Sequence, residues 1–140
     1  MDGASKKSIP LELLIIAGIV IVAVSAFLIF ANSIRVKSRD VRREDDMKQL
    51  RNALDLYVTN NRLYPVCAEG VVDACLLEPL ATDNILRTEP RDPRNVVGDC
   101  GAPDAYVYCY ASEGTSYTLQ YHLETDSIRG KVAGWQTISP

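Results

Sequence analysis

The sequence predicts an α+β protein in which a long N-terminal helix, first transmembrane and then amphipathic, packs on a small antiparallel β-meander with disulfide-stapled loops. Three observations support this fold class. Residues 13–34 form an apolar run without any ionisable side chain. Apolar residues at helical spacing follow this run, and alternating apolar and polar residues near the C-terminus predict strands. A soluble core built around the apolar helix is disfavoured, because 140 residues are few for covering it on all sides.

The first predicted element is a transmembrane helix at residues 9–34, preceded by a short cytoplasmic leader at 1–8. The apolar run has 22 residues, and a helix that rises about 1.5 Å per residue crosses a hydrocarbon core of roughly 30 Å in about 20. A cleaved secretory signal is shorter and ends in small residues, whereas Arg35, Lys37 and Arg39 follow this run. We therefore expect the segment to stay in the mature protein as a single membrane span.

The second predicted element is an extramembrane amphipathic helix at residues 35–61, continuous with the first. Met47, Leu50 and Leu54 recur at steps of three and four, which places them on one apolar face. Neither proline nor glycine interrupts the chain between the membrane segment and this face. The dipeptide Tyr64-Pro65 marks the end of the helix.

The remaining residues, 62–140, are expected to form a loop-rich globular head with a three-stranded antiparallel sheet. Prolines and glycines punctuate residues 65–103, where 74–80 is a short helical candidate. The predicted strands are 105–110, 116–123 and 131–138. Alternation in the second strand indicates one buried face and one wet face, and His122 falls on the wet face. No phosphate loop or set of catalytic partners for His122 is visible, so we predict no enzymatic activity.

Cysteine usage predicts an oxidising compartment for the head. An even set of cysteines in a small extramembrane domain is most simply explained by two disulfides. The sequence permits three pairings, and we favour the local one, Cys67 with Cys75 and Cys100 with Cys109, because each bond closes a loop rich in Gly, Asp or Ala whose path is little constrained. Zinc is the rival interpretation, but C-x7-C and C-x8-C lack the short spacing of structural zinc sites. The four cysteines are Cys67, Cys75, Cys100 and Cys109.

Charge gives conflicting information on topology. Basic residues are more frequent behind the apolar run than in front of it, which by the positive-inside rule places the head in the cytoplasm. The predicted disulfides require the head to lie outside the cytoplasm. We favour this orientation, in which the N-terminus is in the cytoplasm and the head is outside. After Tyr64 the chain has 5 basic and 11 acidic residues, so direct nucleic-acid binding by the head is not expected.

Three features together resemble the type IV pilin and type II secretion pseudopilin superfamily. They are the glutamate at the front of the apolar helix in PLELLIIAGIVIVA, the continuation RVKSRDVRREDDMKQLRNALDLYVTNNRLYP, and the late meander YVYCYASEGTSYTLQYHLETD. The resemblance covers nearly all of the chain. It implies a structural subunit that polymerises through its hydrophobic N-terminal helix into a type IV pilus-like or type II secretion-like filament, with assembly machinery as a partner.

The resemblance also implies roles for the residues around Glu12. In the family this glutamate is the fifth mature residue and meets the free amino terminus of a neighbouring subunit during assembly. An acid near the hydrocarbon boundary is costly without a partner, which agrees with such a role; a headgroup-anchored carboxylate is the alternative. The processing position is then Lys7 followed by Ser8, with cleavage by a prepilin peptidase and N-terminal methylation. The family usually has Gly, less often Ala, where this chain has Lys7.

Two alternatives remain open from the sequence. One is a bitopic membrane-anchored scaffold protein that uses its extramembrane helix as a dimeric coiled coil and does not polymerise. The other is calcium binding in the head loops, since some pseudopilins carry calcium there. Their acidic spacing matches no EF-hand pattern, and the candidate ligands are Asp92, Asp99, Asp104 and Asp126. Adhesion, motility, DNA uptake and secretion machines all use this architecture.

Overall fold

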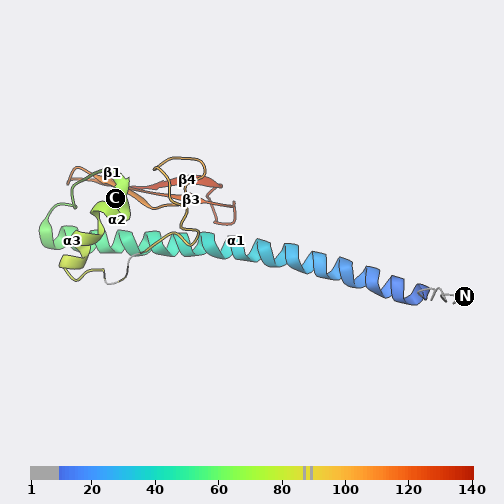
Figure 1. Ribbon diagram of the computed structural model, residues 1–140. Coiled ribbons are helices and arrows are strands. Elements are labelled where there is room, and N and C mark those ends of the chain that lie inside the picture. Colours follow the sequence, from blue (N-terminus) through green and yellow to red (C-terminus); the bar gives the residue numbers. More distant parts are fainter. Residues whose placement is uncertain (1–9, 87, 89) are drawn as a thin grey trace, which may run out of the picture. The chain divides into compact units, whose positions relative to one another are not determined.

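The computed structural model describes residues 10–86, 88 and 90–140. The chain divides into two compact units, Met1–Arg35 and Val36–Pro140. The element order is helix first and sheet later, which confirms the predicted α+β class (Figure 1). The elements are α1 (Leu11–Asn61), β1 (Cys67–Val71), α2 (Val72–Cys75), α3 (Leu77–Thr82), β2 (Cys109–Ser112), β3 (Tyr117–Leu123) and β4 (Gly134–Ile138).

The part of α1 that belongs to the first unit is apolar and exposed. Its most apolar stretch has no buried residue, and the helix is long and apolar enough to cross a membrane. The Ser25 hydroxyl donates to the Ile21 carbonyl oxygen at 2.8 Å, so this polar group is satisfied within the helix itself. Exposed apolar side chains along such a length are unfavourable in water and favourable in lipid.

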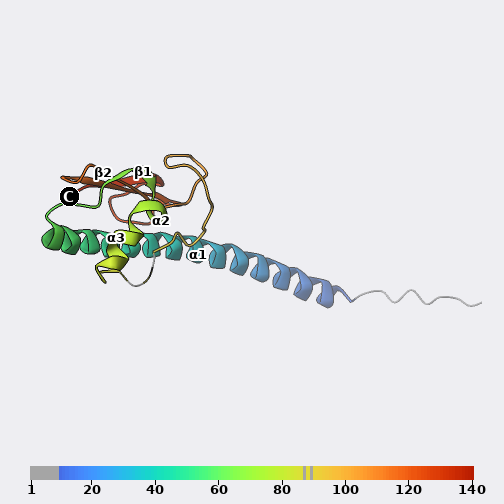
Figure 2. The ribbon, with the colours of Figure 1, turned by 60° about the vertical axis from the view of Figure 1, so that its left-hand side comes forward.

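The part of α1 that belongs to the second unit packs on the sheet. Met47, Leu50 and Leu54 have no exposed surface, as the helical spacing predicted. The sheet supplies the opposing surface, because β3 alternates buried and half-buried residues along its whole length. The tyrosines and leucines of β3 and the methionine and leucines of α1 belong to one buried cluster. Figures 1 and 2 show the sheet running along one side of this part of α1.

Helix α1 ends where the backbone turns left-handed. Arg62 has φ 68°, and its N–H donates to the Val58 carbonyl oxygen at 2.8 Å, a common way for a helix to terminate. The Asn61 amide bonds both to Tyr57 and to the Asp83 carboxylate just after α3. The end of the helix is therefore tied to the head at the position that the sequence predicted.

The sheet has four strands rather than the three that we predicted. Its order is β1-β2-β3-β4, with every neighbouring pair antiparallel. The additional strand, β1, lies within residues 65–103, where we predicted loops and one short helix; it is short, contains Gly70 and does not alternate. Its pairing with β2 is irregular between Cys67 and Gly70, which explains why no period-two pattern is present.

The other boundaries differ by a few residues from the predicted ones. Strand β2 begins at Cys109, because the residues before it form a loop held by a single bridge between Val96 and Tyr106. Strand β4 begins at Gly134, since residues just before it still belong to the turn after β3. The one predicted helix at 74–80 is two short helices, α2 and α3, separated at Leu76.

Candidate functional site

Glu12 lies in the first turn of α1 and its side chain is exposed. A carboxylate is favourable at this end of a helix, because the backbone N–H groups there have no partner within the helix. The turn begins with a bond from the Leu13 N–H to the Pro10 carbonyl oxygen at 3.0 Å. The proposed processing residues Lys7 and Ser8 lie outside the described residues. Glu12 is thus an acidic group at the start of a helix that has no other ionisable side chain up to residue 34.

The apolar part of α1 has a shallow hollow around Gly18. A methyl group placed on Gly18 would meet nothing within 4 Å, so the glycine leaves the helix backbone accessible from this side. Small residues of this kind let the backbones of two membrane helices approach closely. The hollow is lined by Ile15, Gly18, Ile19, Val22 and Ala23.

The second unit contains a buried ion-pair cluster centred on Arg43. The guanidinium has no exposed surface and bonds to three carboxylates from different parts of the chain. Its Nε and Nη2 donate to both oxygens of Asp92 at 2.6 and 3.0 Å. Its Nη1 donates to Asp40 and to Glu124, each at 2.7 Å. The Tyr106 ring lies 5.0 Å from the guanidinium carbon.

The carboxylates of this cluster have further donors, which secure α1 to the turn after β3. Asp40 accepts the backbone N–H groups of Glu124 and Thr125, both at 2.9 Å, and the Thr125 hydroxyl at 2.6 Å. Glu124 also accepts two bonds from Arg39, both at 2.7 Å. Each buried charge is therefore paired and hydrogen-bonded, the condition under which charges are tolerated in a protein interior.

The contacts of the cluster shift the pKa values of Arg43 and Glu124 in the direction that keeps both groups charged. Burial alone would lower the pKa of Arg43, but the bonds to Asp92, Glu124 and Asp40 outweigh it and raise that pKa above its usual value. Burial likewise opposes ionisation of Glu124, and the bonds from Arg39 and Arg43 lower its pKa to about 2. Arg43 and Glu124 therefore stay ionised at neutral and mildly acidic pH.

Two tyrosines of the sheet donate to further acidic residues of α1. The Tyr108 hydroxyl donates to Asp46 at 2.7 Å. The Tyr121 hydroxyl donates to Glu44, which also accepts the Lys131 ammonium at 2.6 Å. Burial, together with these acceptors, raises the pKa of both tyrosines. These contacts fix the rotation of the second part of α1 against the sheet.

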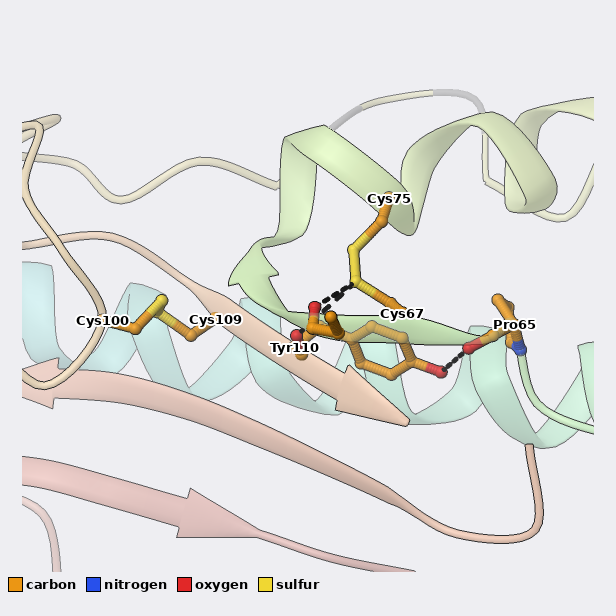
Figure 3. The surroundings of a disulfide bond; sticks show 7 residues. Pro65, Cys67, Cys75, Cys100, Cys109 and Tyr110 are labelled. Carbon is orange, nitrogen blue, oxygen red and sulfur yellow. Dashed lines mark hydrogen bonds between the residues drawn. A yellow bond between two sulfur atoms is a disulfide. The ribbon is translucent and has the colours of Figure 1, made fainter. Parts of the chain in front are cut away.

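Both disulfides join neighbouring elements of the head (Figure 3). Cys67 at the start of β1 pairs with Cys75 in α2, and Cys100 in the preceding loop pairs with Cys109 at the start of β2. This is the local pairing that we predicted from the sequence. Beside the first disulfide, the Tyr110 hydroxyl donates to the Pro65 carbonyl oxygen at 2.8 Å.

The four calcium candidates do not form a metal site. Within the described residues, no group of three or more His, Cys, Asp or Glu is placed to hold a metal ion. Both oxygens of Asp92 accept bonds from Arg43, and Asp126 accepts the Ala133 N–H at 2.6 Å. Asp99 and Asp104 are exposed on the loop before β2.

We predicted that His122 lies on the solvent-facing side of its strand, but its side chain is half-buried. Its ring makes edge contacts with Tyr106 and Trp135, with ring centroids 4.7 and 5.5 Å away. Burial and the nearby Arg43 lower its pKa. The loop that carries Cys100 covers this face of the sheet, because the Trp135 indole donates to Ala102 within it at 2.9 Å.

The Arg43 cluster was not predicted from the sequence, although the sequence contains a signal for it. The buried stripe of α1 runs backward from Leu54 through Leu50 and Met47, and its next two positions are Arg43 and Asp40. Charged residues at stripe positions indicate a buried pair, since that face is covered. Their partners in the loop and turn could not be identified from the sequence, because they lie more than 45 residues away.

Comparisons with protein-family models, with curated proteins and with solved structures found no match to this chain. The structure shows an exposed apolar first part of α1 and, in the second unit, a disulfide-stapled head packed on the second part of α1. Interpretation of function therefore depends on the physical chemistry of these features.

Proposed function

We propose that this chain is a pilin-like or pseudopilin-like structural subunit, which is anchored in a membrane by α1 and polymerises through the apolar part of that helix. The proposal rests mainly on the position of Glu12, whose carboxylate is exposed at the start of an exposed apolar helix. In lipid such a group requires a cation or water. A neighbouring subunit's amino terminus meets this requirement only when subunits assemble, which couples pairing of the charge to polymerisation.

The attachment of the second part of α1 to the sheet supports a structural role. The Arg43 cluster, the two tyrosine contacts and the apolar core all attach the second part of α1 to the sheet. A filament subunit needs such a connection, because its head must follow the position that its helix takes in the packed assembly.

The two disulfides support a topology with the head outside the cytoplasm. Disulfides persist in oxidising compartments and are rare in the cytosol. The proposed orientation therefore has the N-terminus in the cytoplasm and the head in the periplasm or beyond, with an extracellular or periplasmic filament after assembly.

The burial of the amphipathic stripe favours this proposal over a coiled-coil scaffold. A dimeric coiled coil would need apolar residues of the extramembrane helix facing a second copy. Met47, Leu50 and Leu54 instead face the sheet of the same chain. Most of the exposed large apolar side chains of α1 belong to its first part, while its second part exposes Val41 and Leu56.

The test separates membrane insertion from assembly. Glu12→Leu removes an acid from the apolar helix, so it should insert as well as the parent or better, and yet fail to enter filaments. Glu12→Gln keeps the shape but removes the charge, so it should fail almost as completely. Glu113→Gln, an exposed acid on the head, is the matched control and should assemble normally.

The readout is the ratio of filament-incorporated to membrane-bound subunit in cells that retain the assembly machinery. Parental ratios for both Glu12 variants would refute the assembly role and leave Glu12 as an acid near the headgroups. Loss of membrane insertion in Glu12→Leu would refute the reasoning about its cost in lipid.

A further inference from the structure

His122 lies under a loop, on the face of β3 opposite the buried tyrosines and leucines. We call residues 97–105 the cover loop. At its base, the Tyr106 N–H donates to the Val96 carbonyl oxygen at 3.1 Å. The ring of His122 makes edge contacts with both Tyr106 and Trp135. His122 is the only histidine of the chain and Trp135 is its only tryptophan.

The cover loop is attached to the sheet separately from the main buried cluster of the head. The Trp135 indole donates to the Ala102 carbonyl oxygen at 2.9 Å. Ala105 belongs to a second, small buried cluster, which also contains Val107. Cys100 is disulfide-bonded to the start of β2 (Figure 3). The loop can therefore open locally while the sheet stays folded, and the disulfide keeps it attached.

The Nδ1 atom of His122 is buried and has no hydrogen-bond partner among the described residues. A neutral imidazole can leave one ring nitrogen without a proton, whereas the protonated ring has an N–H on both nitrogens. A buried N–H group without an acceptor is unfavourable. Protonation of His122 is therefore opposed while the loop is closed, and opening of the loop removes this opposition by admitting water.

Two cations near His122 oppose its protonation further. The guanidinium carbons of Arg43 and Arg94 lie 5.0 and 4.1 Å from the centroid of the Tyr106 ring. Three nearby carboxylates favour protonation, but each of them is bonded to Arg43: Asp40, Asp92 and Glu124. The cover loop carries the exposed acids Asp99 and Asp104, and β4 carries no charge. Burial, followed by the effect of Arg43, lowers the pKa of His122 below its usual 6.5.

We propose that His122 is a pH-sensitive latch, which keeps the cover loop closed while its ring is neutral and releases the loop when the ring is protonated. Release uncovers Trp135 and the face of the sheet around it. Because closure of the loop lowers the pKa of His122, the neutral ring stabilises the closed loop fully above pH 6.5. This stabilisation is lost as the pH falls from 6.5 toward the lowered pKa.

The test follows the accessibility of Trp135 in the oxidised full chain in detergent micelles, between about pH 8 and about pH 5. Acrylamide, a neutral quencher of tryptophan fluorescence, measures contact of the indole with solvent. Amide hydrogen exchange, corrected for its intrinsic dependence on pH, follows residues 97–105 and strand β3 separately. The variants His122→Phe and His122→Gln both remove the titrating group, and the first keeps an aromatic ring. Asp46→Asn is the control for a titrating carboxylate, because burial raises the pKa of Asp46.

In the parent chain, quenching of Trp135 by acrylamide should increase severalfold as the pH falls, with a midpoint below 6.5. Exchange of residues 97–105 should increase in the same interval, while exchange of β3 stays slow. Both His122 variants should keep the low quenching of neutral pH throughout the range. Asp46→Asn should respond to pH as the parent does.

Quenching and exchange that stay constant over the whole pH range would overturn the proposal. A pH response that persists in both His122 variants would assign the response to a carboxylate and refute the role of His122. Exchange of β3 that rises together with exchange of residues 97–105 would show unfolding of the head rather than release of a loop, which also contradicts a latch. None of these measurements requires assembly, so their outcome is separate from that of the filament test.

Discussion

Replacing Arg43 by methionine should destabilise the head strongly, because it removes a buried cation and leaves its carboxylate partners in place. Methionine is similar in length to the aliphatic part of arginine, so the packing around the chain is largely retained. The change removes four hydrogen bonds to Asp92, Asp40 and Glu124. The decrease in the free energy of unfolding therefore comes mainly from the lost charge contacts and less from the change in side-chain volume.

The size of the expected loss in unfolding free energy depends on the hydrogen bonds that each carboxylate retains without Arg43. At about 1.5–3 kcal/mol for each hydrogen bond to a charged group, four bonds would give an upper limit of about 6–12 kcal/mol. Asp40 retains the Thr125 hydroxyl, Glu124 retains Arg39, and Asp92 retains the Arg94 N–H. The expected loss is therefore nearer to about 3–5 kcal/mol, the cost of breaking a buried pair by removing one partner.

The measurement is the free energy of unfolding of the oxidised full chain in detergent micelles, from urea titrations followed by the near-ultraviolet circular dichroism of the head. Arg42→Met is the matched control. Arg42 is adjacent in sequence, but its side chain is 64% exposed and lies 4.0 Å from Asp46, so its loss should be below about 1 kcal/mol. Similar losses for the two variants, or a loss below about 1 kcal/mol for Arg43→Met, would refute the reasoning.

Two other predictions concern pH and redox state. The folded-state pKa of Glu124 is lowered to about 2 from a usual value of 4.5, so its stabilising contribution should be complete above pH 4.5 and be lost as the pH falls toward 2. Glu124→Gln should flatten the dependence of the unfolding free energy on pH in this interval, and an unchanged slope would contradict the assignment. Peptide mapping without reductant should recover Cys67 joined to Cys75 and Cys100 joined to Cys109. Four free thiols in protein from cells would contradict both the pairing and the proposed compartment.

The sequence was sufficient for features that depend on local periodicity. The apolar run, the stripe at Met47, Leu50 and Leu54, and the alternation in β3 each predict a conformation and a buried face from neighbouring residues. The local disulfides were favoured for a related reason, because the loops between their cysteines are rich in Gly, Asp or Ala and little constrained in their path. The coarse architecture therefore follows from patterns that are at most a few turns or strands long.

Features that depend on distant pairing could not be predicted in the same way. Strand β1 exists because Cys67, Gly70 and Val71 pair with β2, about 40 residues later in the chain, and its own sequence has no period-two pattern. The Arg43 cluster similarly unites α1 with a loop and a turn. His122 lies on the face that alternation assigned to solvent, but a loop held by Trp135 covers it.

The most direct test of polymerisation is photo-cross-linking through the apolar part of α1 in cells. A benzophenone amino acid replaces Val22, which lines the hollow at Gly18, and a control places it at the exposed Thr115 of the head. Because a filament repeats one head-to-tail contact, cross-linking at residue 22 should produce a ladder of dimers, trimers and larger species. A dimer without larger species would indicate a symmetric scaffold. Monomer alone would contradict self-association through this helix.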